Sequence, residues 1–375
     1  MRITDVKALI LRQPDLDASV ADGSQDALLI EVHTDEGLIG VGEVDSSPTV
    51  IKAIIDAPAS HSIACGLRSL LVGEDPTEIS RLWERMFRGT LYFGRRGAAI
   101  HAISGIDIAL WDLLGKATGR PVWSLLGGRH RETVRAYAST LMPEDPGEVA
   151  TVVAQYRDQG FSAIKLGWGP LGRSAQLDVE LVAAARAAGP DVELMIDVGK
   201  GWTSVRDGID RALAIAEYRP AWIEEPFMPD DYPKYAALAQ AVPVPLAAGE
   251  EETTVADFER LIQTGAVEIV QPDVTRAGGI TELMRIADLA RRRGRRCIPH
   301  AWSTGIIKAA TLHVLAAMPE AEYMEYCVQS TPLNESLVAQ RFPVMDGFVR
   351  VPDGPGLGVD LDRERLAACL VDVTG

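Results

Sequence analysis

Apolar residues follow two alternating patterns along the chain from about residue 133 onward. In one pattern several consecutive positions are apolar, which is typical of strands buried on both faces. These runs are 133–140, 162–167, 192–197, 221–225, 244–250, 267–273, 296–300 and 321–327. In the other pattern apolar residues recur every three or four positions, as on an amphipathic helix. These stretches are 146–160, 175–189, 205–218, 230–241, 254–265, 280–294 and 305–318.

Buried strands that alternate with helices indicate parallel strand–helix units. Eight such strands over roughly 200 residues predict an α/β fold of the (β/α)₈ barrel type, which we place at residues 126–344. A doubly wound open sheet is the alternative, although no GxGxxG segment opens any of the predicted helices.

The first 125 residues have a different pattern. Residues 3–14 and 26–44 read as antiparallel strands with a hairpin signal, Asp-Glu-Gly, at 35–37, and helical segments follow, among them 101–120. The tail is rich in glycine and proline and comes too late to be a barrel unit. We therefore predict an α+β capping domain at 1–125, completed by residues 345–375 packing back on it.

Composition excludes several classes of partner. The chain has 375 residues, of which 47% are hydrophobic, and a net charge of −16. Such an acidic chain repels phosphate backbones, so we expect no nucleic-acid partner. No apolar run reaches the roughly 20 residues that cross a bilayer, and no signal peptide is evident, so we expect a cytoplasmic protein without a membrane partner. The cysteines have no CxxC spacing, which indicates reduced thiols (Cys65, Cys297, Cys327, Cys369).

Charged residues close successive predicted strands at intervals of 23 to 27 residues, one strand–helix repeat each: Asp197, Glu224, Glu250, Asp273, His300 and Glu325. In a barrel all of them would lie at the C-terminal mouth. An isolated acid at a strand end is usually the N-cap of the next helix, but several in phase are hard to explain in that way. Asp197, Glu224 and Glu250 on consecutive strands would repel one another unless a cation joined them. Oxygen ligands suit Mg²⁺ first, with Mn²⁺ possible.

Asp273 and His300 lie on adjacent predicted strands. A carboxylate that orients and charges an imidazole makes a general acid/base pair. Glu225 should point to the other face of its strand. There it would support the metal ligands without binding the metal itself, or it would cap a helix. The other histidines have no such neighbourhood (His33, His61, His101, His130, His313).

These residues together resemble the enolase superfamily. The three acids on consecutive strands, in the segments IEEP (223–226) and GE (249–250), match its metal site, and the Asp273–His300 pair with Glu325 matches the mandelate racemase-like subgroup. In the muconate-lactonizing branch a lysine would replace Asp273. The resemblance covers nearly the whole chain, because 109–128 matches the junction between cap and barrel and 355–360 matches the C-terminal return. It implies that Mg²⁺ binds a substrate carboxylate and stabilises the enediolate formed by loss of the α-proton.

Two positions depart from this family pattern. The second barrel strand commonly carries Lys-x-Lys, but here it reads Lys165-Leu166-Gly167, so a glycine stands where a lysine base is expected. Lys165 would contact the substrate carboxylate or act as a weaker base, for which its pKa would have to fall. Gly167 makes room for a bulkier substrate or lets Trp168 approach it. The third strand commonly reads Asp-x-Asn, and here Asp197-Val198-Gly199 precedes Lys200.

The resemblance implies a small-molecule carboxylate substrate and a homo-oligomer. With one evident acid/base group we predict an acid-sugar dehydratase, a hydro-lyase that gives a 2-keto-3-deoxy product. The alternatives are a racemase or epimerase on the same scaffold and a barrel that only binds a carboxylate. Specificity would lie in loops near 13–26 and 45–52, which include Asp45 and Ser46, and the candidate substrate contacts are Lys200, Trp168, Trp302 and Arg173.

Overall fold

Three antiparallel strands begin the chain in a computed structural model that describes residues 1–20 and 22–371. Residue 21, in one predicted specificity loop, and residues 372–375 of the tail lie outside the described residues. The strands are β1 (Ile3–Arg12), β2 (Asp26–Thr34) and β3 (Ile39–Val44), paired in that order. The predicted hairpin joins β2 to β3, with Gly37 at φ 79°. The helices that follow are α1 (Pro48–Asp56), α2 (Leu67–Leu71), α3 (Ile79–Gly89), α4 (Ala98–Thr118) and α5 (Val122–Leu125).

Helix α4 is the centre of this capping domain and lies directly on β3. The two approach so closely that a Cβ atom at Gly40 or Gly42 would lie 2.1 or 2.0 Å from a carbonyl oxygen of α4. Helix α4 is the one described helix long and apolar enough to cross a bilayer, but most of it is buried inside the protein. It is therefore the core helix of the capping domain.

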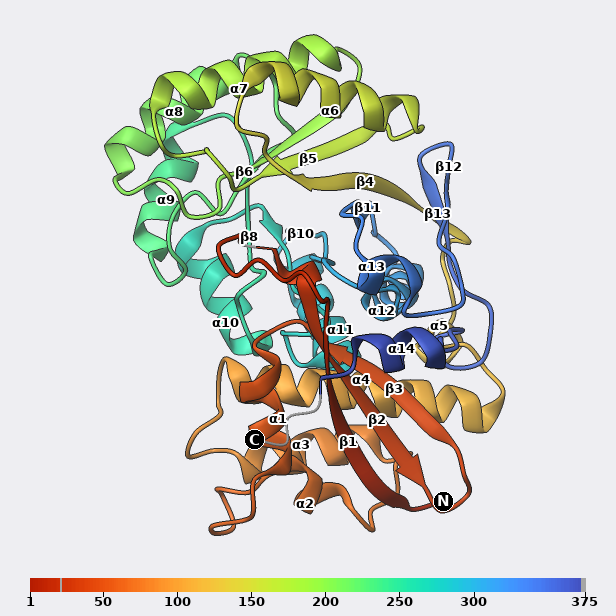
Figure 1. Cartoon of the computed structure of the whole chain (residues 1–375). Coiled ribbons are helices and arrows are strands. Elements are labelled where there is room, and N and C mark those ends of the chain that lie inside the picture. The colour runs from red at the N-terminus through yellow and green to blue at the C-terminus, as the bar shows by residue number, and fades with distance from the viewer. Residues whose placement is uncertain (21, 372–375) are drawn as a thin grey trace.

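Eight parallel strands and their helices form the second domain, as the sequence predicts (Figure 1). The strands are β4 (Thr133–Leu141), β5 (Ala163–Gly167), β6 (Glu193–Asp197), β7 (Trp222–Glu224), β8 (Leu246–Ala248), β9 (Ile269–Val270), β10 (Arg296–Cys297) and β11 (Tyr323–Cys327). The helices between them are α6 (Pro146–Asp158), α7 (Ala175–Ala188), α8 (Val205–Ala216), α9 (Tyr232–Ala241), α10 (Thr254–Arg260) with a π-helical turn at Leu261–Gly265, α11 (Gly279–Arg292) and α12 (Gly305–Ala317). Side chains of Asp145, Ser174, Ser204 and Thr304 cap four of these helices.

The strands pair in sequence order from β4 to β10, and β11 pairs with β4. Among the described strands no ladder joins β10 to β11, so backbone hydrogen bonds do not close the barrel at this seam. One layer of side chains fills the barrel interior, and it includes three aromatic residues in edge-to-face contact, Tyr137, Trp222 and Tyr323.

The tail divides between the two domains. Its first part, the hairpin β12 (Val344–Met345) and β13 (Phe348–Arg350), pairs antiparallel with β4 of the barrel and not with the capping domain, which corrects the predicted start of the return at residue 345. Beyond it, Leu357 N–H donates to Asp112 of α4, and Leu370 bridges to Leu11 of β1. Of two short helices, α13 (Pro332–Ser336) precedes the hairpin, and α14 (Arg363–Cys369) lies along the chain between Leu357 and Leu370.

Helix α4 also holds the capping domain against α11 of the barrel (Figure 1). Asp107 accepts hydrogen bonds from both the Oγ1 (2.6 Å) and the N–H (2.9 Å) of Thr281. Trp111 Nε1 donates to the same hydroxyl at 2.9 Å, and Trp83 Nε1 donates to the carbonyl of Gly278 at 2.8 Å. These contacts place the loops of the capping domain over the mouth of the barrel.

Candidate active site

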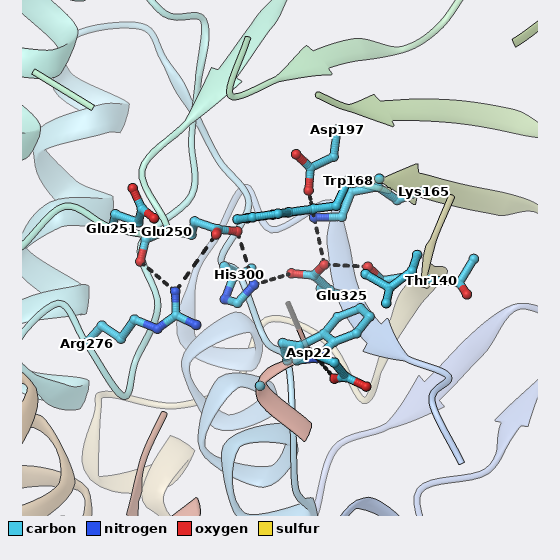
Figure 2. A pocket seen from close by; sticks show the side chains of 15 residues that line it. Asp22, Thr140, Lys165, Trp168, Asp197, Glu250, Glu251, Arg276, His300 and Glu325 are labelled. Carbon is cyan, nitrogen blue, oxygen red and sulfur yellow. Dashed lines mark hydrogen bonds and ion pairs between the residues drawn. The ribbon is translucent and has the colours of Figure 1, made fainter. Parts of the chain in front are cut away.

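A cavity of about 360 Å³ opens at the C-terminal ends of the barrel strands (Figure 2). The barrel supplies most of its lining, from β4 to β11, and the capping domain supplies Asp22 and Gly23. Four of the predicted strand-end residues line it, namely Asp197, Glu250, His300 and Glu325. The other two, Glu224 and Asp273, are not part of the lining but contact it, through Lys165 and His300 respectively.

Asp197, Glu224 and Glu250 form a group that could hold a metal ion. Each offers a carboxylate oxygen, and these oxygens lie within 4.8 Å of one another. Trp222 Nε1 and Gln271 Nε2 both donate to Glu224 Oε2, at 2.8 and 2.7 Å, which orients this carboxylate. Burial, and then the charge of Glu224, raises the pKa of Asp197 well above its usual value. Three crowded, buried carboxylates with only oxygen donors fit a hard divalent cation such as Mg²⁺.

Lys165 is buried among carboxylates. Its ammonium contacts Glu224, lies 2.8 Å from Glu325 Oε1 and lies 3.8 Å from Asp197 Oδ2. Burial lowers its pKa, but these carboxylates outweigh that effect and hold the pKa well above the usual lysine value. The shift is opposite to the one that a lysine base requires, so in this arrangement Lys165 is a fixed cation.

His300 and Asp273 form a close pair. His300 Nδ1 lies 2.6 Å from Asp273 Oδ2, and Asp273 Oδ1 accepts from both the N–H and the hydroxyl of Thr275 at 2.6 Å. Burial lowers the pKa of His300, but Glu325, Glu250 and Asp273 together raise it to about 10. The other ring nitrogen, Nε2, lies 3.3 Å from Glu250 Oε2, on the cavity side. His300 is thus held as a proton donor that faces the cavity.

Glu325 connects the strands on either side of the barrel seam. Its Oε1 accepts from Ser139 Oγ of β4 at 2.7 Å, and its Oε2 accepts from the N–H of Ala301 at 2.8 Å. Burial opposes ionisation, but Lys165 and His300 lower the pKa of Glu325 to about 2. The carboxylate is therefore an anion that holds both cations in place.

Gly167 stands beside Asp197 in the ladder between β5 and β6. A Cβ atom at this position would lie 2.6 Å from the Cβ and 2.9 Å from the Oδ2 of Asp197, so no larger side chain fits without movement. Trp168 lines the cavity, but Gly167 is not what admits it, because the atoms nearest to a Cβ at Gly167 all belong to Asp197. Gly199 makes room for this indole, because a Cβ there would lie 2.7 Å from the ring.

Lys200 does not line the cavity. Its Nζ is 4.0 Å from the centroid of the Trp168 ring, and it pairs with Glu225 at 3.0 Å and Glu251 at 2.9 Å. Glu225 also lies close to the proposed metal ligand Glu250, because carboxylate oxygens of Glu225, Glu250 and Glu251 lie within 4.8 Å of one another. Arg173 is more than half exposed, pairs with Glu144, and also lies outside the cavity lining, whereas Trp302 is part of it.

The sequence interpretation missed several residues that reach the site from the capping domain or the loops. Arg276 lines the cavity and donates to Asp45 Oδ2 at 2.5 Å and to the carbonyl of Glu250 at 3.2 Å. His101, which seemed isolated in sequence, lies 3.0 Å from Ser46, and burial and Arg276 lower its pKa to about 4. Only the position of Arg276, three residues after Asp273, was a usable signal in the sequence.

A barrel with charged residues at its strand ends and an α+β capping domain defines a class of protein. Comparison with known proteins identifies the family within that class. Residues 148–365 match the family described as enolase C-terminal domain-like, and residues 4–127 match the mandelate racemase / muconate lactonizing enzyme N-terminal domain. The chain belongs to this family, the mandelate racemase-like part of the enolase superfamily, as its sequence indicates.

The chain is similar to proteins named as cycloisomerases and as dehydratases. The chain is 34% identical to D-galactarolactone cycloisomerase of Agrobacterium fabrum, with 98% of each chain covered. It is 33% identical to arabinonate dehydratase of Saccharolobus solfataricus, covering 90% of this chain and 89% of that one. Among solved structures, the 3,6-anhydro-D-galactonate cycloisomerase of Zobellia galactanivorans has a TM-score of 0.89 at 30% identity, covering 99% of this chain and all of the other.

Proposed function

We propose that this protein removes the proton α to the carboxylate of a sugar acid and then eliminates water from the β-carbon, which gives a 2-keto-3-deoxy acid. The observation that supports this best is the meeting, in one cavity, of the Asp273–His300 pair with three carboxylates able to hold Mg²⁺. A lysine base is absent at Gly167, which favours a reaction that one acid/base group can perform.

Each group of residues in the cavity would have its own role in this reaction. Asp197, Glu224 and Glu250 would hold the divalent cation, which when bound would neutralise charge on the substrate carboxylate. Lys165 and Glu325 keep their ion pair and fix the geometry around that carboxylate. His300 in its neutral form takes the α-proton at Nε2 and then returns a proton to the leaving hydroxyl, which departs as water. One histidine can do both when the proton and the hydroxyl leave from the same face of the substrate.

Protonation of His300 is linked to metal binding. Glu250, one of the carboxylates that raise the pKa of His300, is also a proposed metal ligand. A cation on Glu250 would offset its charge and favour the neutral imidazole, which is the form that accepts the α-proton.

Cycloisomerisation is a second candidate, because the chain matches D-galactarolactone cycloisomerase over 98% of both chains but the arabinonate dehydratase over about 90%. The same α-proton removal would then expel a ring or lactone oxygen, with no water released. The two reactions differ only in the leaving oxygen, so the same residues serve both.

A screen of sugar acids and their lactones with Mg²⁺ in D₂O tests the proposal. We expect a keto product from at least one compound, and a His300→Asn variant that makes none but still binds metal. In a parallel reaction in H₂O, loss of water in the product mass indicates dehydration, and an unchanged mass indicates cycloisomerisation. Rapid deuterium exchange with inversion at the α-carbon, and no keto product, would show a racemase or epimerase instead. Ligand binding with neither exchange nor product would show a barrel that only binds carboxylates.

A further inference from the structure

The cavity lining carries more negatively charged than positively charged side chains. Five carboxylates face it, from Asp22, Asp197, Glu250, Glu251 and Glu325, against the cations Lys165 and Arg276 and the imidazole of His300. A sugar acid brings at least one further negative charge into this space. The substrate class thus depends on how many of the cations are free to receive a carboxylate.

Every cation in the described lining is already paired with a protein carboxylate. Lys165 is held by Glu224 and Glu325, Arg276 by Asp45, and His300 by Asp273 (2.6 Å). The proposed metal site can receive one substrate carboxylate. A second carboxylate on the same substrate would find no unpaired cation among the described residues of the lining.

Asp22 is the carboxylate on the capping-domain side of the cavity. It lies on the opposite side of His300 and Glu325 from Asp197 in Figure 2. Its Oδ1 accepts from the N–H of Ser24 at 2.9 Å and from Trp302 Nε1 at 3.0 Å, which fixes its direction. Within the described part of the chain Oδ2 has no hydrogen-bond donor, so it can accept a hydrogen bond from a sugar hydroxyl.

We propose that Asp22 selects substrates that carry a single carboxylate, either an aldonic acid or a lactone with one free carboxyl, over the dicarboxylic acid of the same carbon skeleton. This inference rests on the proposed function. The neutral hydroxyl end of a monoacid donates to Asp22 Oδ2, whereas a second carboxylate at that end is repelled by Asp22 and meets no cation.

The test compares monoacids and diacids that differ only at the last carbon, such as galactonate with galactarate and gluconate with glucarate. Turnover is followed by keto-product formation, and Mg²⁺-dependent binding is measured separately by calorimetry. We expect the wild-type protein to prefer the accepted monoacid by about tenfold or more, on the order expected for a carboxylate pair in a partly solvated site. Asp22→Asn, which keeps an acceptor for Trp302, should reduce that ratio at least about fivefold, mainly by improving the diacid. Asp15→Asn makes the same charge change on the same loop outside the cavity lining and should leave the ratio unchanged.

The outcomes separate this inference from the proposed function. Equal or better use of the diacid, or the same ratio in Asp22→Asn as in wild type, overturns the inference while the elimination reaction stands. Preferential binding of monoacids without any elimination product supports the inference and overturns the proposed function. If no acid of either kind binds with Mg²⁺ or reacts, both are overturned.

Discussion

Replacing Gly167 with alanine should damage the metal site through a single contact. The new Cβ would lie 2.6 Å from the Cβ of Asp197 and 2.9 Å from its Oδ2. Backbone strain is not involved, since Gly167 is not among the residues with positive φ. The neighbour that has to move is Asp197, which is the first in sequence of the three proposed Mg²⁺ ligands.

The geometry sets the size of the effect. Asp197 must shift by about 0.8 Å for the two Cβ atoms to reach ordinary contact at 3.4 Å. A misplacement of about 1 Å in a catalytic site costs about 10²-fold in rate. We therefore expect Gly167→Ala to lose about one to two orders of magnitude in turnover and at least about tenfold in Mg²⁺ affinity. Gly167→Lys starts from the same Cβ, so it should not restore a second base.

Titration with Mn²⁺, followed by electron paramagnetic resonance, measures metal affinity without any assumption about the substrate. Thermal denaturation with and without Mg²⁺ shows whether the variant is folded. Gly147→Ala is the matched control, because Gly147 is exposed on α6 and its Cβ would meet one oxygen, of Asp145, at 3.2 Å. A Gly167→Ala protein with the metal affinity and turnover of Gly147→Ala would refute the reasoning.

Three further variants probe other groups. His300→Asn should lose about 10²–10⁴-fold in kcat while Mn²⁺ affinity stays within a few-fold of wild type, and near-normal turnover would remove His300 from the mechanism. Asp197→Asn should relieve repulsion between buried carboxylates, so the melting temperature of the variant without metal should equal or exceed that of wild type. Mg²⁺ should raise the melting temperature of the variant less than that of wild type. An equal rise in both proteins would contradict metal binding by Asp197. Burial raises the pKa of Glu43 from 4.5 to about 7, so stability should fall as pH rises between these values, by at most about 3 kcal/mol. Urea denaturation at pH 5 and pH 8 should show a smaller fall in Glu43→Gln than in wild type, because burial also raises the pKa of Asp107 and Glu252 to about 7 and these groups keep their share; an equal fall in both would assign it to other groups.

The sequence was sufficient for the barrel because each strand and helix carries its own local pattern. The predicted strand at 244–250, for example, contains the observed β8 at Leu246–Ala248. Strand-end residues gather at one mouth because parallel strands end on the same side of a barrel. Their roles as ligands or acid/base groups remain predictions.

Contacts between the two domains could not be predicted from local sequence patterns. Asp22 and Trp302 are 280 residues apart, and Asp45 and Arg276 are 231 residues apart, so no local pattern links them. The pKa of Lys165 depends on which carboxylates surround its ammonium in space, so the sequence left open whether Lys165 is a substrate contact or a base. Arg173 is a candidate substrate contact from its position after β5, but its side chain pairs with Glu144 outside the cavity lining.

The open seam between β10 and β11 affects how variants of Glu325 should be interpreted. Glu325 on β11 accepts from Ala301, shortly after β10, and from Ser139 on β4, so this one side chain bridges the gap left by the missing ladder. Shortening it would leave buried donors without partners and loosen the ring of strands at the same time as it changes the charge near His300. A loss of activity in such a variant would therefore combine mechanical and chemical effects. Hydrogen exchange at the amides flanking the seam would be needed to tell the two apart.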